Sequence, residues 1–528
     1  MEIRLLFKSA RSAVIEIDEG GIYHTRESYM IMVNGETYVH TCRVITSLWG
    51  LKPDSIYHIQ VQGNSGDRKE LKFRTEREFV TLDVREFGAK GDGKRDDTLP
   101  IQAAIMACPK DGRVLIPKGT YRVTSIFLKS DLRLELAKNA VLLAETIRSR
   151  YPVFPGLIES YDETGEYNLG TWEGNPLPMF TGIITGINVE NVLLYGEGTV
   201  DGRAGEGDWW ENPKIMRGAF RPRLLFLNKC SNITVQGIHW KNSPAWTIHP
   251  YFSTNLTFLD LDINNPADSP NTDGLNPESC KSVKITGTKF SLGDDCIAIK
   301  SGKIYMGRKY KVPCENIEIR QCYMERGHGA VTIGSEMAAG VYQVLVKDCI
   351  FQSTDRGLRI KTRRGRGKDA IIDGIVFDHI HMKEVKTPFV VNCFYFCDPD
   401  GKTRYVQSKE TYPVDDRTPS IKKLTFTNII CEDCHVAAAY FYGLPEQKIE
   451  EVILDHVTVT YEIQPEPDVP AMTCGIKPRI KQGIFAANIK KLFLREVNIR
   501  GQIGEALILQ QIDQVDRAGF CHKRETKL

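Results

Sequence analysis

The sequence has no long uninterrupted apolar run. None of its 528 residues lies in a stretch that approaches the ~20 apolar residues of a membrane-spanning helix. Residues 1–8 contain neither the apolar core nor the small-residue cleavage site of a secretory signal peptide. We therefore expect a cytoplasmic protein without a membrane partner.

A strong charge of one sign is also missing. The formal net charge is +2 at pH 7, although 26% of the residues are charged. A chain of this charge does not bind nucleic acid through its whole surface, but a local basic cleft is compatible with it. The hydrophobic share of 41% is typical of a globular protein.

Metal-binding cysteine patterns are incomplete. The 14 cysteines are scattered, and Cys431 and Cys434 form the one CxxC pair. No second pair and no suitably spaced histidines complete the four ligands of a zinc site. We predict no metal and no cofactor, and we interpret the cysteines as reduced thiols that serve as small buried residues.

Residues 1–80 have the pattern of a small β module. Asn34-Gly35 between two apolar runs predicts a hairpin with a type I′ turn. The spacing of Leu51, Pro53 and Tyr57 resembles the tyrosine corner of fibronectin type III β-sandwiches. This segment carries no catalytic constellation, so we interpret it as a packing or spacer module. Direct sugar binding is the alternative.

The second domain, residues 81–528, has the pattern of a repeat array. A short amphipathic helix is expected at 101–106, and a unit then recurs at steps of about 23 to about 49 residues. In each unit a polar residue precedes a short apolar strand. The shorter steps cannot hold a propeller blade, whereas a parallel β-helix rung of about three short strands fits them. The units begin at Asn191, Asn232, Asn255, Ser282, Asn316, Gln343, Gly374, Lys423, Glu451 and Lys491.

Four short polar motifs occur within one stretch of this array. Each lies beside a short apolar run, at a similar phase of successive rungs. A parallel solenoid stacks equivalent positions ~4.8 Å apart, so we expect these groups to line one face. The motifs contain the carboxylates of Asp273, Asp294 and Asp295, then His328, and then the cations Arg359 and Lys361.

Three stacked carboxylates repel one another, so a purely structural surface would seldom carry them. Their repulsion raises the pKa of one carboxyl group, which stays protonated near neutral pH, while its ionised neighbours can take a proton from water. Each motif alone fits an ordinary turn, and Gly-Asp-Asp alone fits half of a calcium site. Four motifs in one order favour an acid–base site.

Together, the four motifs resemble the signature of the polygalacturonases of glycoside hydrolase family 28. They read Asn271-Thr272-Asp273, Gly293-Asp294-Asp295, Gly327-His328-Gly329 and Arg359-Ile360-Lys361. Further similarity lies in 196–202 and 242–250, and the resemblance covers roughly residues 82–515. It implies an all-β fold, a right-handed parallel β-helix, and metal-free hydrolysis of α-1,4 bonds between galacturonates with inversion.

The resemblance also implies roles for the acidic residues and the histidine. It makes Asp294 the general acid, and it gives the activation of water to Asp273 and Asp295. His328 matches the histidine that supports the protonation of the acid.

Four further residues are expected to bind substrate. Arg359 and Lys361 match the cations that hold a substrate carboxylate, and Asn271 belongs to the same signature. Lys300 resembles a residue of exo-acting bacterial members and is expected to bind a second carboxylate, with an ordinary surface lysine as the alternative. Asn276 is a departure, because many relatives carry an acid there, and we expect it to affect fine specificity.

Physical arguments agree with this assignment. An inverting enzyme needs ~6.5–9.5 Å between acid and base, and we expect carboxylates on neighbouring rungs to supply that gap. A galacturonate polymer is anionic, and the basic run 359–368 is expected to extend the cationic clamp that opposes its charge. A nucleic-acid patch is the alternative for this run, but interleaved aromatic residues are missing.

Three long inserts, 151–179, 392–420 and 463–481, interrupt the repeat. Aperiodic loops of this length are usually functional, and aromatic residues such as Tyr161 argue against disorder. Such loops can close one end of a groove. We therefore expect an exo-acting enzyme that trims oligogalacturonides or polygalacturonate from the non-reducing end.

Three alternatives remain open at this point. A calcium-dependent pectate lyase and a rhamnogalacturonan hydrolase use the same fold, and a non-catalytic carbohydrate-binding β-helix protein would bind without turnover. The expected partner in each case is a sugar polymer and not a nucleic acid. The sequence does not specify an oligomeric state.

Overall fold

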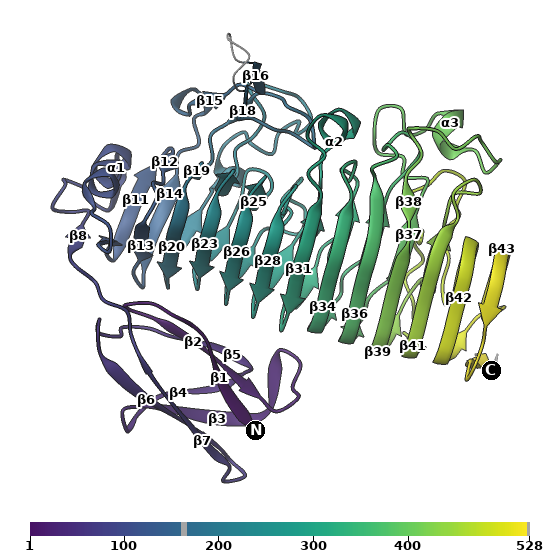
Figure 1. Ribbon diagram of the computed structural model, residues 1–528, viewed down its shortest axis with the longest axis horizontal. Helices are drawn as coiled ribbons and strands as arrows, with labels where there is room; N and C mark the ends of the chain where they lie inside the picture. Colours follow the sequence, from purple (N-terminus) through teal and green to yellow (C-terminus); the bar gives the residue numbers. More distant parts are fainter. Residues whose placement is uncertain (160–165, 525–528) are drawn as a thin grey trace.

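The computed structural model describes residues 1–159 and 166–524, so Tyr161 lies outside the described residues. The chain forms a long parallel β-helix, and a small β module lies beside its N-terminal half (Figure 1). No helix among the described residues is long and apolar enough to cross a membrane.

The N-terminal module consists of two antiparallel sheets that enclose an apolar core. The three-stranded sheet has the order β1 (Glu2–Lys8), β2 (Ala13–Asp18), β5 (Ile45–Leu48). The four-stranded sheet has the order β4 (Glu36–Arg43), β3 (His24–Val33), β6 (Ile56–Gly63), β7 (Arg68–Arg74).

The turn between β3 and β4 has the geometry that the sequence predicts. Asn34 and Gly35 have φ of 53° and 87°, as a type I′ turn requires, so the hairpin prediction is confirmed. The Tyr57 hydroxyl accepts a hydrogen bond from the Lys52 backbone N–H at 2.7 Å. The fibronectin type III topology of the module stays a prediction.

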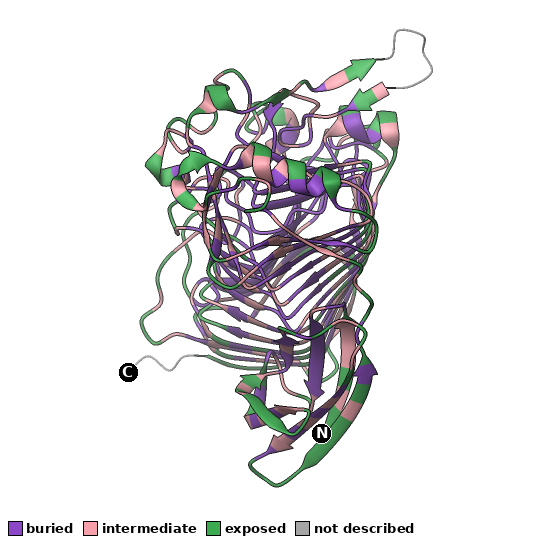
Figure 2. Cartoon of the chain, turned by 90° about the vertical axis from the view of Figure 1, so that its left-hand side faces the viewer, coloured by how far each residue is buried: buried purple, intermediate pink, exposed green. Residues whose placement is uncertain are grey.

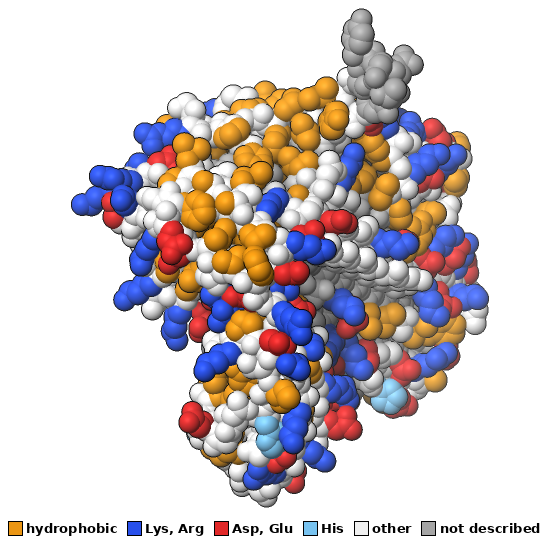
Figure 3. Space-filling view, turned by 60° about the vertical axis from the view of Figure 1, so that its left-hand side comes forward, with side chains coloured by type: hydrophobic (Ala, Val, Ile, Leu, Met, Phe, Trp, Pro, Cys, Tyr) orange, Lys and Arg blue, Asp and Glu red, His pale blue; other side chains and the backbone are white. Residues whose placement is uncertain are grey.

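The module is fixed to the outside of the β-helix by polar and apolar contacts. Arg43 pairs with Asp260 at 2.8 Å, and the Ser12 hydroxyl donates to the Gln236 side-chain oxygen at 2.8 Å. Leu259 of the β-helix packs in an apolar cluster with residues of β2 and β5. Charged side chains of both signs are mixed over the visible face of the two parts (Figure 3).

The β-helix begins at β8, seven residues after β7 ends, and it is built from three parallel sheets. The first sheet contains β8 (Thr81–Asp83), β10 (Arg113–Ile116), β13 (Leu132–Leu136), β20 (Glu190–Gly196), β23 (Ser231–Gln236), β26 (Thr254–Leu259), β28 (Lys281–Thr286), β31 (Cys314–Arg320), β34 (Val341–Gln352), β36 (Ile371–Lys383), β38 (Ser420–Ile421), β39 (Lys423–Cys434), β41 (Ile449–Tyr461) and β42 (Gln482–Gln502).

The second sheet runs beside the first, and the long strands β34, β36, β39, β41 and β42 pass from one into the other. Its shorter members are β9 (Asp92–Asp96), β11 (Gly119–Val123), β14 (Ala140–Ala144), β21 (Thr199–Asp201), β24 (His239–Lys241), β27 (Asp262–Asn264), β29 (Lys289–Leu292), β32 (Tyr323–Arg326) and β44 (Cys521–Arg524).

The third sheet completes each rung, and the site described below lies on it. It contains β12 (Ile126–Phe127), β19 (Ile184–Ile187), β22 (Leu225–Asn228), β25 (Ile248–Tyr251), β30 (Ile297–Ile299), β33 (Val331–Gly334), β35 (Arg356–Lys361), β37 (Thr387–Asn392), β40 (Ala437–Tyr442) and β43 (Leu507–Asp516). The predicted all-β fold, with a parallel β-helix after a small β module, is confirmed.

Asparagine side chains form a ladder at the corner where the first sheet begins. Asn232 donates to the side-chain oxygen of Asn191 at 3.3 Å, and Asn255 donates to that of Asn232 at 3.3 Å. All three residues have positive φ, a conformation that asparagine tolerates better than most residues. The residues that begin the next predicted units, from Ser282 to Gly374, also have positive φ, whereas Lys423, Glu451 and Lys491 do not. The first residue therefore turns the chain at this corner in the units from Asn191 to Gly374.

The interior of the coil is filled by stacked apolar side chains, and buried residues line it along its length (Figure 2). The helix α1 (Thr98–Ala107) packs on the first coil, where the sequence predicts a short helix. The remaining elements lie in inserts and connections: β15 (Val153–Phe154), β16 (Leu157–Glu159), β17 (Glu166–Asn168), β18 (Met179–Phe180), α2 (Ile304–Tyr310), α3 (Arg404–Gln407), and the 3-10 turns η1 (Arg148–Arg150) and η2 (Ala204–Glu206).

Candidate active site

The predicted site residues lie where the second sheet gives way to the third. Asp294 and Asp295 lie between β29 and β30, and His328 lies at the corresponding place between β32 and β33. Arg359 and Lys361 lie in β35, which pairs with β33. Successive rungs therefore bring residues that are distant in sequence to one face.

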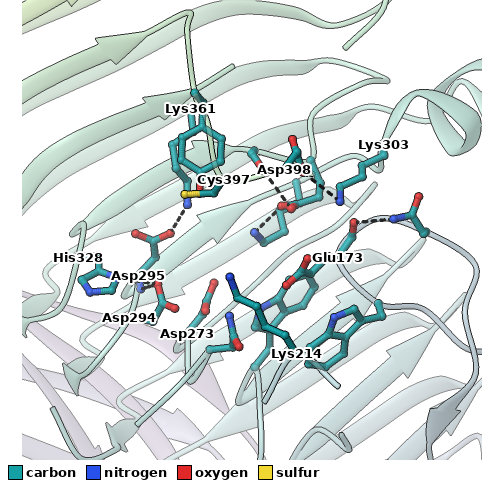
Figure 4. Close-up of a pocket in the computed structure, with 18 of the residues that line it drawn as sticks. Glu173, Lys214, Asp273, Asp294, Asp295, Lys303, His328, Lys361, Cys397 and Asp398 are labelled. Atoms are coloured by element: carbon teal, nitrogen blue, oxygen red, sulfur yellow. Dashed lines mark hydrogen bonds and ion pairs between the residues drawn. The ribbon is translucent and has the colours of Figure 1, made fainter. Parts of the chain in front are cut away.

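Asp273 joins this group from the preceding rung. It lies two residues before Leu275, which forms isolated bridges with Ile248 and Ile297 of the neighbouring third-sheet strands. One cleft of about 580 Å³ contains all eight of the predicted residues: Asn271, Asp273, Asp294, Asp295, Lys300, His328, Arg359 and Lys361. Figure 4 shows the three aspartates side by side, with Asp295 directed at Lys361.

The three aspartates are more compact than the sequence predicts. One carboxylate oxygen of each of Asp273, Asp294 and Asp295 lies within 4.8 Å of the others. These nearest oxygens are therefore closer together than the ~6.5–9.5 Å that we expected between acid and base. The reason is the spacing of rungs: equivalent positions of adjacent rungs are only ~4.8 Å apart.

Two cations hold Asp295 in its ionised form. Arg359 Nη1 lies 2.8 Å from Asp295 Oδ1, and Lys361 Nζ lies 2.7 Å from Oδ2. Burial opposes ionisation, but the adjacent Lys361 and Arg359 hold the pKa of Asp295 well below its usual range. The sequence predicts that both cations hold a substrate carboxylate; in the structure both line the cleft and both engage Asp295.

Asp273 is the member of the trio that binds a proton most readily. Burial, followed by the charge of Asp294, raises the pKa of Asp273 to about 7. Burial acts on Asp294 in the same direction, but a hydrogen bond with His328 leaves the pKa of Asp294 below its ordinary value. The three carboxyl groups titrate as a unit, and they keep one proton near neutral pH.

His328 stabilises the charged form of Asp294. Its Nδ1 lies 3.2 Å from Asp294 Oδ1, and this hydrogen bond raises the pKa of His328. A protonated histidine next to a carboxylate favours the ionised carboxylate. The contact with Asp294 agrees with the predicted pairing. Its electrostatic effect differs from the prediction, because His328 favours the ionised form of Asp294 and the sequence predicts support of the protonated form.

Lys300 is buried, so the alternative of an ordinary surface lysine is wrong. It is 3% exposed, pairs with Glu336 at 2.8 Å and lies 4.6 Å from the centre of the Trp246 ring. Asn271 also lines the cleft, and its side-chain oxygen accepts a hydrogen bond from Arg221 at 2.6 Å.

Asn276 directly contacts the trio. Its side-chain amide donates to Asp273 Oδ2 at 2.8 Å, and the residue is fully buried. A donor at this place stabilises the ionised form of Asp273.

The inserts supply the residues that the sequence analysis did not single out. Glu173, Asp398 and Met472 come one from each insert and line the cleft together with Lys303 and Glu336. Lys303 pairs with Asp398 at 3.2 Å. The sequence could have indicated Glu336, because it follows the apolar strand β33 on a rung that also carries His328. No local pattern marks the residues of the inserts.

The basic run after Lys361 does not extend the cationic clamp, and this prediction is wrong. Arg363, Arg364 and Arg366 are at most 5% exposed, and none of them lines the cleft. Arg363 and Arg366 pair with Asp398, while Arg364 pairs with Glu446 and donates to backbone carbonyls of the second insert. These arginines are bound mainly by carbonyls and acids of the second insert. They therefore fix the insert that forms one side of the cleft, and they do not form an exposed nucleic-acid patch.

The trio is the one group among the described residues whose ligand atoms could surround a metal ion. Oxygen ligands of this kind suit calcium or magnesium. Arg359 and Lys361 already neutralise Asp295, which works against a divalent cation at the same place. The absence of a metal from the reaction stays a prediction.

Fold and site together define a parallel β-helix enzyme that uses acid–base chemistry. The sequence profile of "Glycosyl hydrolases family 28" matches residues 163–474, and the profile "Rhamnogalacturonase A/epimerase, pectate lyase-like" matches residues 81–134.

Relatives match a larger part of the chain. A probable polygalacturonase of Vitis vinifera is 30% identical over 410 residues, which are 74% of this chain and 78% of the relative. An exopolygalacturonase of Zea mays is 26% identical over 414 residues, 76% of this chain and 88% of the relative. The chain therefore belongs to glycosyl hydrolase family 28, and the predictions of this family and of a glycoside hydrolase are confirmed.

A solved structure supports the same architecture. The family 28 exopolygalacturonase of Yersinia enterocolitica superposes with a TM-score of 0.68 at 18% identity, and the match covers 99% of this chain and 98% of that chain. At this identity the match shows the fold. It extends over the N-terminal module as well as the β-helix.

Replacing Arg364 by methionine should lower the free energy of unfolding by about 3–5 kcal/mol, because Glu446 is left buried without its partner. Urea unfolding measures the change. The double variant Arg364→Met/Glu446→Leu removes both charges and should recover the part of the loss that the unpaired Glu446 charge causes, but not the part due to the hydrogen bonds of Arg364 to backbone carbonyls. A loss below about 1 kcal/mol in the single variant would contradict the structural role of Arg364.

Proposed function

We propose that the protein is an exo-polygalacturonase, which removes units from the ends of oligogalacturonides or polygalacturonate. The observation that carries this proposal is the trio of Asp273, Asp294 and Asp295 in one cleft with Arg359 and Lys361. The acids suit proton transfer in hydrolysis, and the cations suit an anionic polymer. Relatives named polygalacturonase support the substrate class.

In the proposed mechanism Asp294 donates a proton to the glycosidic oxygen while the bond from that oxygen to the anomeric carbon breaks. A water oxygen bonds to the anomeric carbon from the opposite face and gives its proton to Asp295 or Asp273, so the configuration inverts. Asp295 suits the role of base because two ion pairs keep it ionised.

The short distances within the trio explain how Asp294 can receive the proton that it donates. Asp273 is the member of the trio with the raised pKa, about 7, whereas the family resemblance places the acid at Asp294. The nearest oxygens of the trio lie within 4.8 Å of one another, so one water that bridges them can take the proton from Asp273 and give its own proton to Asp294. Its transfer to Asp294 loads the acid and at the same time leaves Asp273 ionised as a base.

Exo action is supported by the walls of the cleft. Relatives named as exo- and as endo-polygalacturonases both match the chain, so similarity alone does not distinguish the two modes. The inserts 151–179, 392–420 and 463–481 all contribute lining residues, and they gather on the side of the β-helix away from the N-terminal module (Figure 1). Walls of this kind favour binding of a chain end.

The other candidate functions fit the site less well. A pectate lyase would need calcium and an arginine base, but Arg359 is engaged by Asp295. A rhamnogalacturonan hydrolase is supported by a profile match over 81–134 only. A non-catalytic binder of an anionic sugar would gain nothing from three clustered acids.

A cytoplasmic location is part of the proposal. All 14 cysteines are free, which suits a reducing compartment. An enzyme there would act on imported oligogalacturonides. Cell fractionation tests this, and recovery of the protein outside the cytoplasm would contradict it.

Incubation with trigalacturonate should release galacturonate units without producing ultraviolet-absorbing double bonds, and chelation with EDTA should leave the rate unchanged. Proton NMR during the first turnovers should show the β-anomer of the new reducing end, as inversion requires. Calcium-dependent absorbance would support a lyase. Binding without turnover would support the non-catalytic alternative, and an initial α-anomer would overturn inversion.

Each of Asp294→Asn, Asp273→Asn and Asp295→Asn should lower kcat on trigalacturonate by at least about 10³-fold. Only Asp294→Asn should recover activity on an aryl galacturonoside, because an activated leaving group does not need protonation. Initial rates on both substrates measure this. Recovery in Asp273→Asn instead would reassign the acid to Asp273.

Asn276→Asp should move the alkaline limb of the pH profile of kcat/KM upward by about one unit, because a fourth carboxylate raises the pKa of the trio. Activity that needs the shared proton is present below this pKa and is lost as pH rises through it. Asn264→Asp, which adds the same charge at the exposed end of β27, is the matched control. Equal profiles of the two variants would contradict the role of Asn276.

A further inference from the structure

The first insert reaches the cleft through a tight turn. Trp172 and Asn175 form an antiparallel bridge, and the two residues between them, Glu173 and Gly174, have φ of 45° and 73°. Glycine adopts this conformation freely, whereas for glutamate it is costly. Backbone strain of this kind clusters at functional sites.

The turn is anchored on both sides. The Trp172 ring stacks on Phe220 with 4.6 Å between ring centres. The Lys303 backbone N–H donates to the Gly174 carbonyl at 3.0 Å, and a Cβ at Gly174 would lie 2.8 Å from Glu336 Cγ. The position of Glu173 is therefore fixed against the wall that holds Lys303 and Glu336.

The Glu173 carboxylate has no partner within the part of the chain that the structure describes. It lines the cleft, and burial, with a contribution from Glu336, raises its pKa. Two of the nearby cations are engaged, Lys300 by Glu336 and Lys303 by Asp398, while Lys214 also lines the cleft and forms no ion pair with Glu173. The side chain is partly buried, and a partly buried carboxylate without donors is stabilised when a ligand supplies them.

The chemistry of the ligand follows from this imbalance. Sugar hydroxyl groups are donors, and a carboxylate accepts from two of them. A uronate carboxylate placed against Glu173 would be repelled by it, whereas Lys214 of the same cleft, unpaired among the described residues, suits the carboxylate of the terminal unit. Figure 4 shows Glu173 and Lys303 on one side of the cleft and His328 on the other. The wall next to Glu173 thus suits a sugar that presents hydroxyls, as the end of a chain does.

We propose that Glu173 is a specificity-determining residue that accepts hydrogen bonds from hydroxyl groups of the terminal galacturonate and repels the carboxylate of any unit beyond it. Glu173 thereby makes the enzyme select chain ends. This inference rests on the proposed exo-polygalacturonase function.

The test compares Glu173→Gln with the wild type on hexagalacturonate labelled at its reducing end. Glutamine keeps the size of the side chain, but its amide can donate to a carboxylate. We expect kcat/KM for the hexamer to fall about 10-fold, the loss of one hydrogen bond to a charged group. We also expect labelled products of internal cleavage to rise from the first turnovers.

Glu159→Gln is the matched control, because Glu159 belongs to the same insert, is exposed and does not line the cleft. Circular dichroism checks that all variants are folded. Glu173→Asp, which keeps the charge, should retain end selection.

The outcomes separate this inference from the proposed function. A wild-type enzyme that does not cleave the hexamer, or that cleaves it internally, overturns the proposed function before any variant is compared. A wild type that releases end units while Glu173→Gln keeps the same products and the same kcat/KM as Glu159→Gln overturns the role of Glu173 alone. Internal cleavage that appears only in Glu173→Gln supports it.

Discussion

Asp295 lies between Arg359 and Lys361, and these two buried ion pairs allow three carboxylates to share one cleft. Without them, the repulsion among Asp273, Asp294 and Asp295 would favour protonation of more than one group. Burial and the charge of Asp294, with a smaller contribution from Asp295, raise the pKa of Asp273, so this group binds a single proton most readily. A cluster with one mobile proton and one fixed charge has both an acid and a base near neutral pH.

The geometry of this cluster depends on the stacking of rungs. Backbone hydrogen bonds between parallel strands fix the distance between Asp273, Asp294 and His328, which follow equivalent strands of consecutive rungs. The asparagine ladder at another corner keeps the rungs in phase. The same stacking makes the trio compact, because adjacent rungs cannot move apart to widen an acid–base gap. The acids therefore act as a coupled group and not as two separate carboxyls.

The sequence predicts those features of the protein that repeat. The polar residue before each apolar strand reveals the rungs, and the order of the four motifs places Asp273, Asp294, Asp295 and His328 on one face. The partners of charged side chains do not repeat, so the sequence does not predict which residues form ion pairs. Arg364 follows the motif of Lys361 directly, yet it is buried against Glu446, 82 residues away. Glu173 has no motif either, because its place in the cleft results from a turn of an aperiodic insert.

Rungs and inserts also have different functions in the enzyme. The rungs hold the proton-transferring groups, and any shift of one rung would disturb its neighbours on both sides. The inserts meet the rungs mainly through side chains and turns, as Gly174 does at Lys303 and Asp398 does at Arg363. An insert can therefore change without altering the spacing of the trio. In our proposal Glu173 recognises the end of the substrate chain. A single turn outside the repeat then selects chain ends over internal bonds, while the stacked rungs carry the residues that cleave the bond.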